Sequence, residues 1–218
     1  MVALFADLDA QQLIERIVAR GEERRCLRPL RVFSERTPAR DSLARDPRRW
    51  LPFLDPASRY LVVWDHQGSG FGDVSIAEAH ARQCLVGAGI AEERVCAVAL
   101  DPEVEAALMP AWERVKGILA VGSGGPRSMP ADDEVLRRAR HHGVAADVPW
   151  AEAVIRHPKE VFRGLLDLLQ KRPSSAHFDA LGQKLSVPLL KQPLADGSPS
   201  PIGRITAQLV TWFPRHEG

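Results

Sequence analysis

A short run of apolar residues, Tyr60 to Trp64, ends in Asp65 and leads directly into a glycine-rich segment. A continuous apolar run of this length, bounded by turn residues, is typical of a strand that is buried on both faces of a parallel sheet. Ligands of open α/β sheets bind just beyond the carboxyl ends of such strands. Asp65 is therefore a candidate residue of a metal or phosphate site, and it is an equally good candidate for a cap of the following turn.

The residues after Asp65 add to this candidate site. Gly68 and Gly70 let the backbone turn sharply or approach a ligand closely. His66 adjoins Asp65 and is a titratable neighbour of the candidate acid. The predicted site therefore includes His66, Gly68 and Gly70.

Two other places in the chain show the same order of an apolar run followed by acids. They are Val2–Ala6 with Asp7 and Asp9, and Arg94–Leu100 with Asp101, Glu103 and Glu105. Apolar residues at helical spacing follow each of the three runs. The predicted helices cover Ala10–Arg20, Ser75–Gly87 and Pro102–Leu119. Strands that alternate with helices predict an α/β fold with a mostly parallel sheet flanked by helices.

Local signals predict the remaining segments of this half. Ser75 and Glu78 have the spacing of a capping box, which predicts that Ser75 caps the second helix. Leu27–Phe33 is predicted as another strand. Thr37–Arg49, rich in arginine and interrupted by prolines, is predicted as an exposed loop, and Trp50–Phe53 as a helical turn.

A breaker-rich segment, residues 120–131, predicts a boundary between two parts of the chain. Residues 1–121 would form the α/β domain, and residues 122–218 a helical C-terminal region packed on it. The helices predicted in this region cover Asp132–His142, Lys159–Gln170, Ala176–Leu185 and Ile202–Phe213.

The acids at the three strand ends are expected to converge on one edge of the sheet, because parallel strands point their carboxyl ends the same way. This requires the first and third strands to be neighbours. Mg²⁺ is usually held by one or two carboxylates together with water and phosphate oxygens. The alternative is that these acids only cap turns and helices and do not meet.

Composition narrows the class of protein. The net charge is +1, no apolar run approaches the roughly 20 residues of a membrane helix, and the N-terminus lacks the pattern of a signal peptide. Cys26, Cys84 and Cys96 are far apart and make no zinc-finger pattern. We therefore expect a cytoplasmic protein that does not contact a membrane.

Arginine is concentrated near the N-terminus. Between Ile14 and Trp50 there are 11 arginines and 6 acids. Such a segment suits contact with DNA phosphates, and that contact would weaken steeply with salt. The alternative, which we favour, is a solvated face with internal ion pairs.

Several short motifs, taken in order, resemble a family of small Toprim-like proteins encoded in bacterial defence islands, including methylation-associated defence systems. The motifs are Asp65-His66-Gln67-Gly68-Ser69-Gly70, Asp101-Pro102-Glu103-Val104-Glu105-Ala106, His157-Pro158-Lys159-Glu160, Lys171-Arg172-Pro173-Ser174-Ser175 and Trp212-Phe213-Pro214. Together they span nearly the whole chain. The resemblance implies a Toprim-like α/β domain with an acidic Mg²⁺ site and a role in antiviral defence.

The chain departs from the family pattern at the acids themselves. Asp7 stands where a Glu is expected, and Asp65-His66-Gln67 keeps only the first acid of an Asp-x-Asp pair. Asp101 stands where the family often has Glu, and Ala107 where it has Trp.

Two functions from different classes follow from the resemblance. The chain would be a catalytically silent subunit that binds other proteins of a defence system, or a Mg²⁺-dependent nuclease or phosphodiesterase acting on nucleic acid. In the second case Asp7, Asp65 and Glu103 would hold the metal, with Glu105 as a further catalytic acid. Lys159 and Arg172 would then contact phosphate. The missing acids favour the silent subunit.

Overall fold

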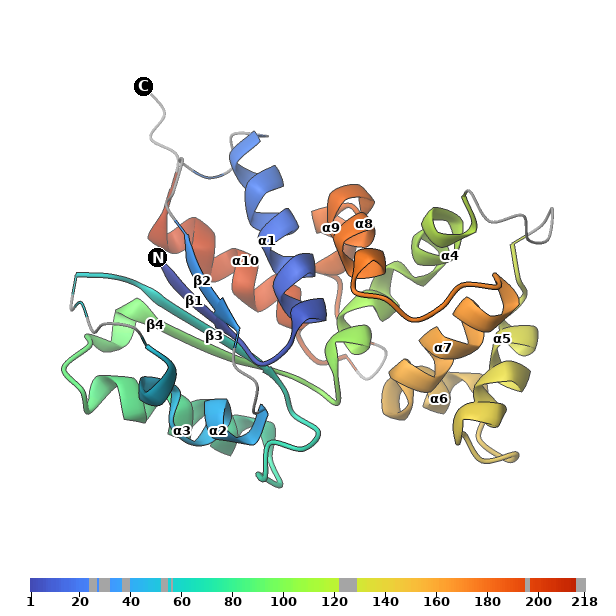
Figure 1. Cartoon of the computed structure of the whole chain (residues 1–218), viewed down its shortest axis with the longest axis horizontal. Coiled ribbons are helices and arrows are strands. Elements are labelled where there is room, and N and C mark those ends of the chain that lie inside the picture. Colours follow the sequence, from blue (N-terminus) through green and yellow to red (C-terminus); the bar gives the residue numbers. More distant parts are fainter. Residues whose placement is uncertain are drawn as a thin grey trace.

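The computed structural model describes residues 1–23, 27, 32–36, 40–51, 55, 57–121, 129–194 and 197–214. Within these residues, four parallel strands form one sheet in the order β2-β1-β3-β4, and helices flank it (Figure 1). The strands are β1 (Val2–Phe5), β2 (Phe33–Arg36), β3 (Tyr60–Asp65) and β4 (Val95–Leu100). The α/β fold with a parallel sheet is thus confirmed.

The first and third strands are neighbours, as convergence of the acids requires. Phe5 of β1 lies opposite Val63 of β3, so Asp7 and Asp65 follow adjacent strand ends. The strand order reverses at this point, because β1 is followed by β2 on one side and paired with β3 on the other. In open α/β sheets this switch point is where ligands bind.

Both faces of the sheet are covered, which explains the unbroken apolar run of β3. Leu61 and Val63 belong to a core that includes α1 (Leu8–Glu23) and α10 (Pro201–Trp212). Val62 and Trp64 point to the other face and pack with α2 (Arg40–Arg45) and α3 (Val74–Val86). All six residues of β3 are buried, as expected for the interior of a parallel sheet.

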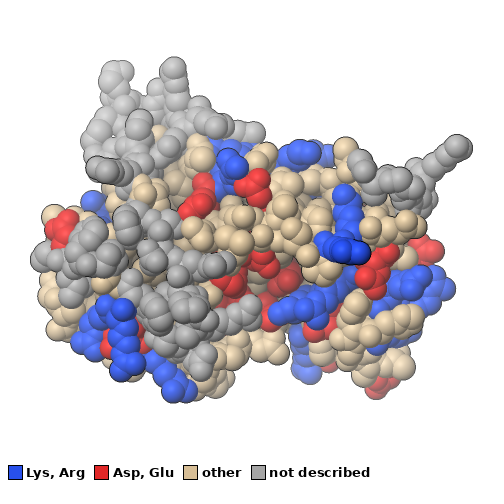
Figure 2. Space-filling model, in the orientation of Figure 1, with Lys and Arg blue, Asp and Glu red and all other residues tan. Residues whose placement is uncertain are grey.

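The C-terminal half consists of helices that share one core with α1 and a face of the sheet. They are η3 (Val104–Ala111), α4 (Trp112–Ala120), α5 (Asp132–Ala139), η4 (Arg140–His142), α6 (Trp150–Arg156), α7 (Pro158–Leu168), α8 (Ala176–Lys184) and α9 (Val187–Leu190). Helix α8 packs on α1, and α5 packs on α7. The space-filling view shows acidic side chains where the sheet half meets the helical half (Figure 2).

Two predictions in the N-terminal half need correction. Strand β2 covers Phe33–Arg36 rather than Leu27–Phe33; residues 28–31 lie outside the described part, and Leu27 forms an isolated bridge with Pro214. The predicted loop at 37–49 contains α2, whose Leu43 is fully buried. It also contains the start of η1 (Pro47–Trp50). Pro47 opens this short helix, where its missing N–H costs nothing. Of the predicted turn at 50–53, residues 52 and 53 are outside the description.

Two helix starts also differ from expectation. Asp73, not Ser75, caps α3, because its Oδ1 accepts from the Ile76 N–H at 3.0 Å. The single helix predicted from Pro102 to Leu119 is instead the 3₁₀ helix η3 followed by α4. Pro110 lies inside η3, and a proline interrupts helical hydrogen bonding because it has no N–H.

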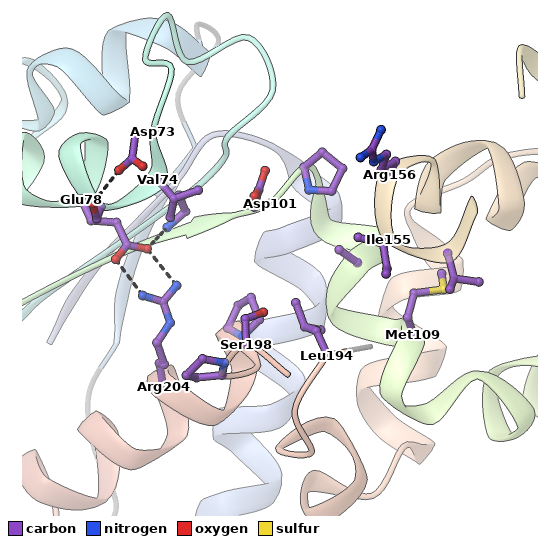
Figure 3. A pocket seen from close by; sticks show the side chains of 17 residues that line it. Asp73, Val74, Glu78, Asp101, Met109, Ile155, Arg156, Leu194, Ser198 and Arg204 are labelled. Atoms are coloured by element: carbon purple, nitrogen blue, oxygen red, sulfur yellow. Dashed lines mark hydrogen bonds and ion pairs between the residues drawn. The ribbon is translucent and has the colours of Figure 1, made fainter. Parts of the chain in front are cut away.

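Glu78 does not form the predicted capping box. Together with Arg204 it covers the edge of the sheet at β4. Oε1 of Glu78 accepts a hydrogen bond of 2.8 Å from the backbone N–H of Ala99 in the edge strand β4. Arg204 of α10 donates to both Glu78 oxygens at 2.7 and 2.8 Å (Figure 3). The ion pair therefore joins α3 and α10 across the strand, which protects an edge that could otherwise pair with another chain.

No helix in the described part of the chain is long and apolar enough to cross a bilayer.

We predict that Arg204→Met lowers the free energy of unfolding by about 1–3 kcal/mol, because it leaves the buried Glu78 carboxylate without its bidentate partner. Urea unfolding measures this loss. The double variant Glu78→Gln/Arg204→Met should recover part of it.

The matched control is Arg156→Met, which removes an exposed arginine that pairs with Glu152 at 3.1 Å on the surface. Its effect should stay below about 0.5 kcal/mol. Equal losses in the two arginine variants would contradict the role given to Arg204.

Candidate functional site

Asp7 and Asp65 each use one carboxylate oxygen to organise the backbone at the sheet edge. Asp7 Oδ1 accepts from the Ala10 N–H at 2.8 Å and so holds the first turn of α1. Asp7 Oδ2 is buried, and no hydrogen-bond partner lies near it in the described part. Asp65 is 2% exposed, and its Oδ1 accepts from the Val104 N–H at 3.0 Å. Asp65 thus ties the end of β3 to the segment after β4.

Glu103 forms the closest ion pair of the site. It is buried, and its Oε1 lies 2.5 Å from Nζ of Lys159, which is one-quarter exposed. Lys159 follows Pro158 in the first turn of α7. A helix from the C-terminal half therefore supplies the counter-ion for an acid that follows β4.

Glu105 is a buried acid whose charge is suppressed. Burial raises the pKa of Glu105 to about 7, and the negative charges of Glu103 and Asp9 act in the same direction. Its own backbone N–H and the ammonium of Lys159 oppose this rise. Acids that follow β1 and β4 therefore interact electrostatically around Lys159.

The glycine-rich segment after β3 contacts other parts of the protein. Gly68 and Gly70 have φ angles of +85° and +80°, which favour glycine. A Cβ at Gly70 would lie 2.6 Å from Nη2 of Arg45, so this glycine makes room for an arginine. His66 Nδ1 is buried without a described partner. His66 also interacts weakly with Asp73, whose pKa is lowered mainly by the Ser75 hydroxyl.

The two predicted phosphate-binding residues lie in different settings. Lys159 contacts Glu103, as described above. Arg172 is exposed between α7 and α8, and its carbonyl oxygen lies 2.9 Å from Nε2 of His177. A signal for the role of Lys159 is present in the sequence, because a cation in the first turn of a helix opposes the helix dipole. Such a residue gains from an acidic partner elsewhere in the fold.

The donors at this edge are of the kind that Mg²⁺ prefers, but their arrangement does not fit the ion. Carboxylate oxygens are typical Mg²⁺ ligands. Among the residues that the structure describes, no three Asp, Glu, His or Cys side chains are grouped so that they could hold a metal. The ammonium of Lys159 forms an ion pair with the Glu103 carboxylate, and Asp7 and Asp65 each accept a hydrogen bond from a backbone N–H. A metal ion would have to displace Lys159.

A cavity of about 650 Å³, which no sequence pattern predicts, lies beside the end of β4. One wall carries the start of α3 with the Glu78–Arg204 pair, and the opposite wall carries Met109, Ile155 and Leu194 (Figure 3). The lining residues come from four stretches that lie far apart in the sequence, 73–78, 99–109, 154–156 and 194–204, so no local pattern indicates the cavity.

Several arginines of the N-terminal segment form internal contacts. Arg16 pairs with Asp179 at 2.5 Å, and Arg20 donates to the carbonyl oxygens of Gly182 and Leu185. Arg48 pairs with Asp46 at 2.7 Å. Residues 24–26, 28–31 and 37–39 lie outside the described part.

Comparison with models of known protein families, with curated proteins and with solved structures gives no match to this chain. The inference about function therefore rests on the fold and on the residues of the sheet edge.

We predict that Glu105→Gln stabilises the protein at pH 8 but not at pH 4. The pKa of Glu105 is higher in the folded protein than in the unfolded chain, so the folded state binds more protons between pH 4.5 and 7. Wild-type stability therefore falls as pH rises through this window, by at most about 3 kcal/mol. Urea unfolding of both proteins across pH 4–8 measures it.

Glu92→Gln is the control, since Glu92 is exposed. Its stability difference from wild type should not change with pH in the same way. A constant difference for Glu105→Gln across the range would contradict the raised pKa.

We also predict that Lys159→Met costs roughly 2–3 kcal/mol of stability, because it leaves buried Glu103 without its counter-ion. Adding Glu103→Gln should restore much of this loss. Additive losses in a double-mutant cycle by urea unfolding would show that the two side chains do not interact.

Proposed function

We propose that this protein is a Toprim-like component of a bacterial anti-phage defence system, and that it acts by binding other proteins of that system rather than by catalysis. The observation that carries the proposal is the 2.5 Å ion pair between Lys159 and buried Glu103. The motif resemblance to small Toprim-like proteins of defence islands supplies the biological setting.

An internal ammonium does the electrostatic work that a metal ion would do in an active acidic site. Two opposite charges in contact within a partly buried site attract each other strongly. A metal ion that binds Glu103 must first break the ion pair with Lys159, and the attraction within that pair is lost. Mg²⁺ also gives up its water reluctantly. Both costs favour the paired, metal-free arrangement.

The state of Glu105 supports the same proposal. Burial raises the pKa of Glu105 to about 7. At neutral pH Glu105 therefore offers a cation less negative charge than an exposed glutamate would. Two effects therefore lower the negative charge at this edge of the sheet. Lys159 pairs with Glu103, and burial favours the protonated form of Glu105.

One observation favours the second candidate, a Mg²⁺-dependent nuclease or phosphodiesterase. Asp7 Oδ2 is buried and has no described partner, and a buried polar atom without a partner is costly. In this candidate Asp7, Asp65 and Glu103 would hold the ion, and Lys159 would turn toward phosphate. Partner binding and catalysis are separated by the experiments below.

Isothermal titration of Mg²⁺ and Mn²⁺ into the full chain tests the metal. We expect no saturable binding by wild type. Binding that is lost in Asp65→Ala would support the nuclease candidate and call for cleavage assays on DNA and RNA.

Plaque assays on cells that carry the complete defence locus test two things: whether the chain is required for protection from phage, and whether protection requires the carboxylates. Asp7→Asn and Asp65→Asn keep an acceptor oxygen for the Ala10 and Val104 N–H groups while removing the charge. We expect both variants to protect cells as well as wild type and to co-purify with the same partner proteins. Deletion of the chain should abolish protection. Loss of protection in both variants, with partner binding retained, would overturn the silent-subunit proposal.

A further inference from the structure

We propose that Cys84, His80 and the backbone carbonyl of Arg45 form a Zn²⁺-binding site on the face of the sheet covered by α2 and α3. Cys84 and His80 lie four residues apart in α3, so both side chains project from the same side of that helix. Arg45 is the last residue of α2, where helix carbonyls lack a partner within the helix.

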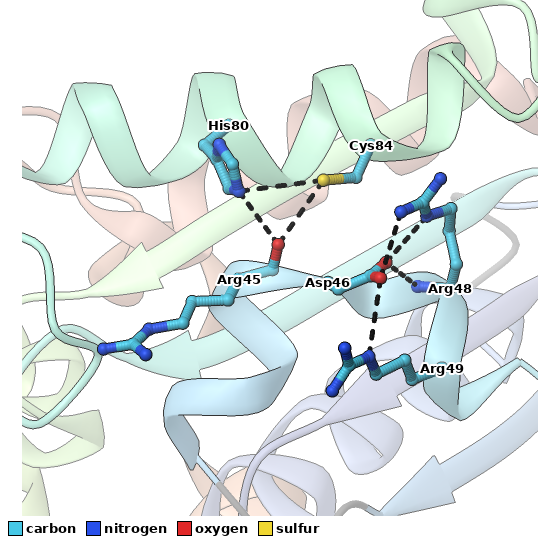
Figure 4. A network of polar contacts seen from close by, with 6 residues as sticks. All are labelled: Arg45, Asp46, Arg48, Arg49, His80 and Cys84. Carbon is cyan, nitrogen blue, oxygen red and sulfur yellow. Dashed lines mark hydrogen bonds and ion pairs between the residues drawn. The ribbon is translucent and has the colours of Figure 1, made fainter.

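The three donor atoms are in mutual contact. Nε2 of His80 lies 2.9 Å from the Arg45 carbonyl oxygen, and Sγ of Cys84 lies 3.4 Å from the same oxygen. Sγ and Nε2 are 3.8 Å apart. Figure 4 shows both side chains turned toward the carbonyl, while the Arg45 guanidinium extends away from it.

The size of this triangle suits zinc. A triangle with these sides has its centre about 2.0 Å from each corner. Zinc bonds to nitrogen and oxygen are about 2.0–2.2 Å and to sulfur about 2.3 Å. An ion slightly above the plane of the three atoms therefore reaches all of them with shifts of a few tenths of an ångström. His80 is exposed, so water can complete a tetrahedral site from the solvent side.

The donor chemistry selects zinc over magnesium. Thiolate and imidazole are ligands for Zn²⁺, whereas Mg²⁺ prefers oxygen alone. The ring of His80 is positioned by Phe71, with ring centroids 5.3 Å apart. Two side chains and one carbonyl make this set, so it differs from a group of three metal-binding side chains, which the described residues lack.

Binding is balanced by the release of one proton. Burial raises the pKa of the Cys84 thiol, and the nearby Asp46 carboxylate adds to this, so the free protein holds a thiol at neutral pH. Zn²⁺ takes the thiolate, and the thiol proton passes to solvent. In the free protein the contact with the Arg45 carbonyl oxygen places the imidazole proton of His80 on Nε2, because a carbonyl oxygen only accepts. Zn²⁺ binding therefore requires this proton to exchange to Nδ1, which leaves the Nε2 lone pair for the ion. Asp46 pairs with both Arg48 and Arg49 and offsets one of their two positive charges.

Co²⁺ titration of the full chain, followed by displacement with Zn²⁺, tests the site. We expect one Co²⁺ per chain, visible absorption bands of a four-coordinate ion, and a thiolate-to-cobalt charge-transfer band that Zn²⁺ abolishes. Cys84→Ser should remove the charge-transfer band, and His80→Ala should weaken binding at least tenfold. Cys26→Ser should leave both unchanged.

His177→Ala is the matched control. His177 Nε2 lies 2.9 Å from the Arg172 carbonyl oxygen, the same histidine–carbonyl contact, with no thiol in the contacts described. This variant should bind Co²⁺ as wild type does.

Two results would overturn the proposal: no charge-transfer band in wild type, or a band that survives in Cys84→Ser. The wild-type spectrum decides even if a variant fails to fold. In either case the three groups form only a hydrogen-bonded contact between α2 and α3.

Discussion

The burial of β3 on both faces is the constraint on which the rest of the structure depends. Tyr60, Val62 and Trp64 pack on one side, and Leu61 and Val63 on the other. A strand without a solvent-facing side must satisfy its backbone inside the sheet, between β1 and β4. The only carboxylate of β3 is therefore Asp65, at its carboxyl end. The same rule places Asp7 after β1 and Glu103 after β4, so the acids gather at one edge.

Gathering acids at a buried edge creates a charge that the fold must neutralise, and the C-terminal half supplies the cations. Lys159 of α7 pairs with Glu103, and Arg204 of α10 pairs with Glu78 beside β4. Arg20 of α1, in the N-terminal half, donates in turn to the carbonyl oxygens of Gly182 and Leu185 in the C-terminal half. These helices are thus part of the electrostatic structure of the sheet. The proposed function follows from this, because a site whose counter-ion is built in has little to gain from a metal ion.

Sequence reasoning worked where a single local rule dominates. The limits of β1, β3 and β4 were predicted within a residue, because continuous apolar runs that end in acids are bounded on both sides. It failed where local rules compete. Asp73 and Ser75 are both good N-cap residues. A capping box at Ser75 would use the carboxylate of Glu78, but that carboxylate accepts hydrogen bonds from Ala99 and Arg204, and Asp73 is the cap. The segment at 37–49 is rich in arginine and contains prolines, which predicts an exposed loop. Leu43 is nevertheless fully buried and anchors a helix in the core.

The sequence by itself determined the α/β class, the buried central strand and the presence of acids at three strand ends. These depend on the order of residues along the chain and on the direction shared by parallel strands. The tertiary structure alone decided the partners of those acids. Lys159 is 56 residues from Glu103, and Arg204 is 126 residues from Glu78. Such contacts depend on how helices pack on the sheet, and no local pattern encodes that packing.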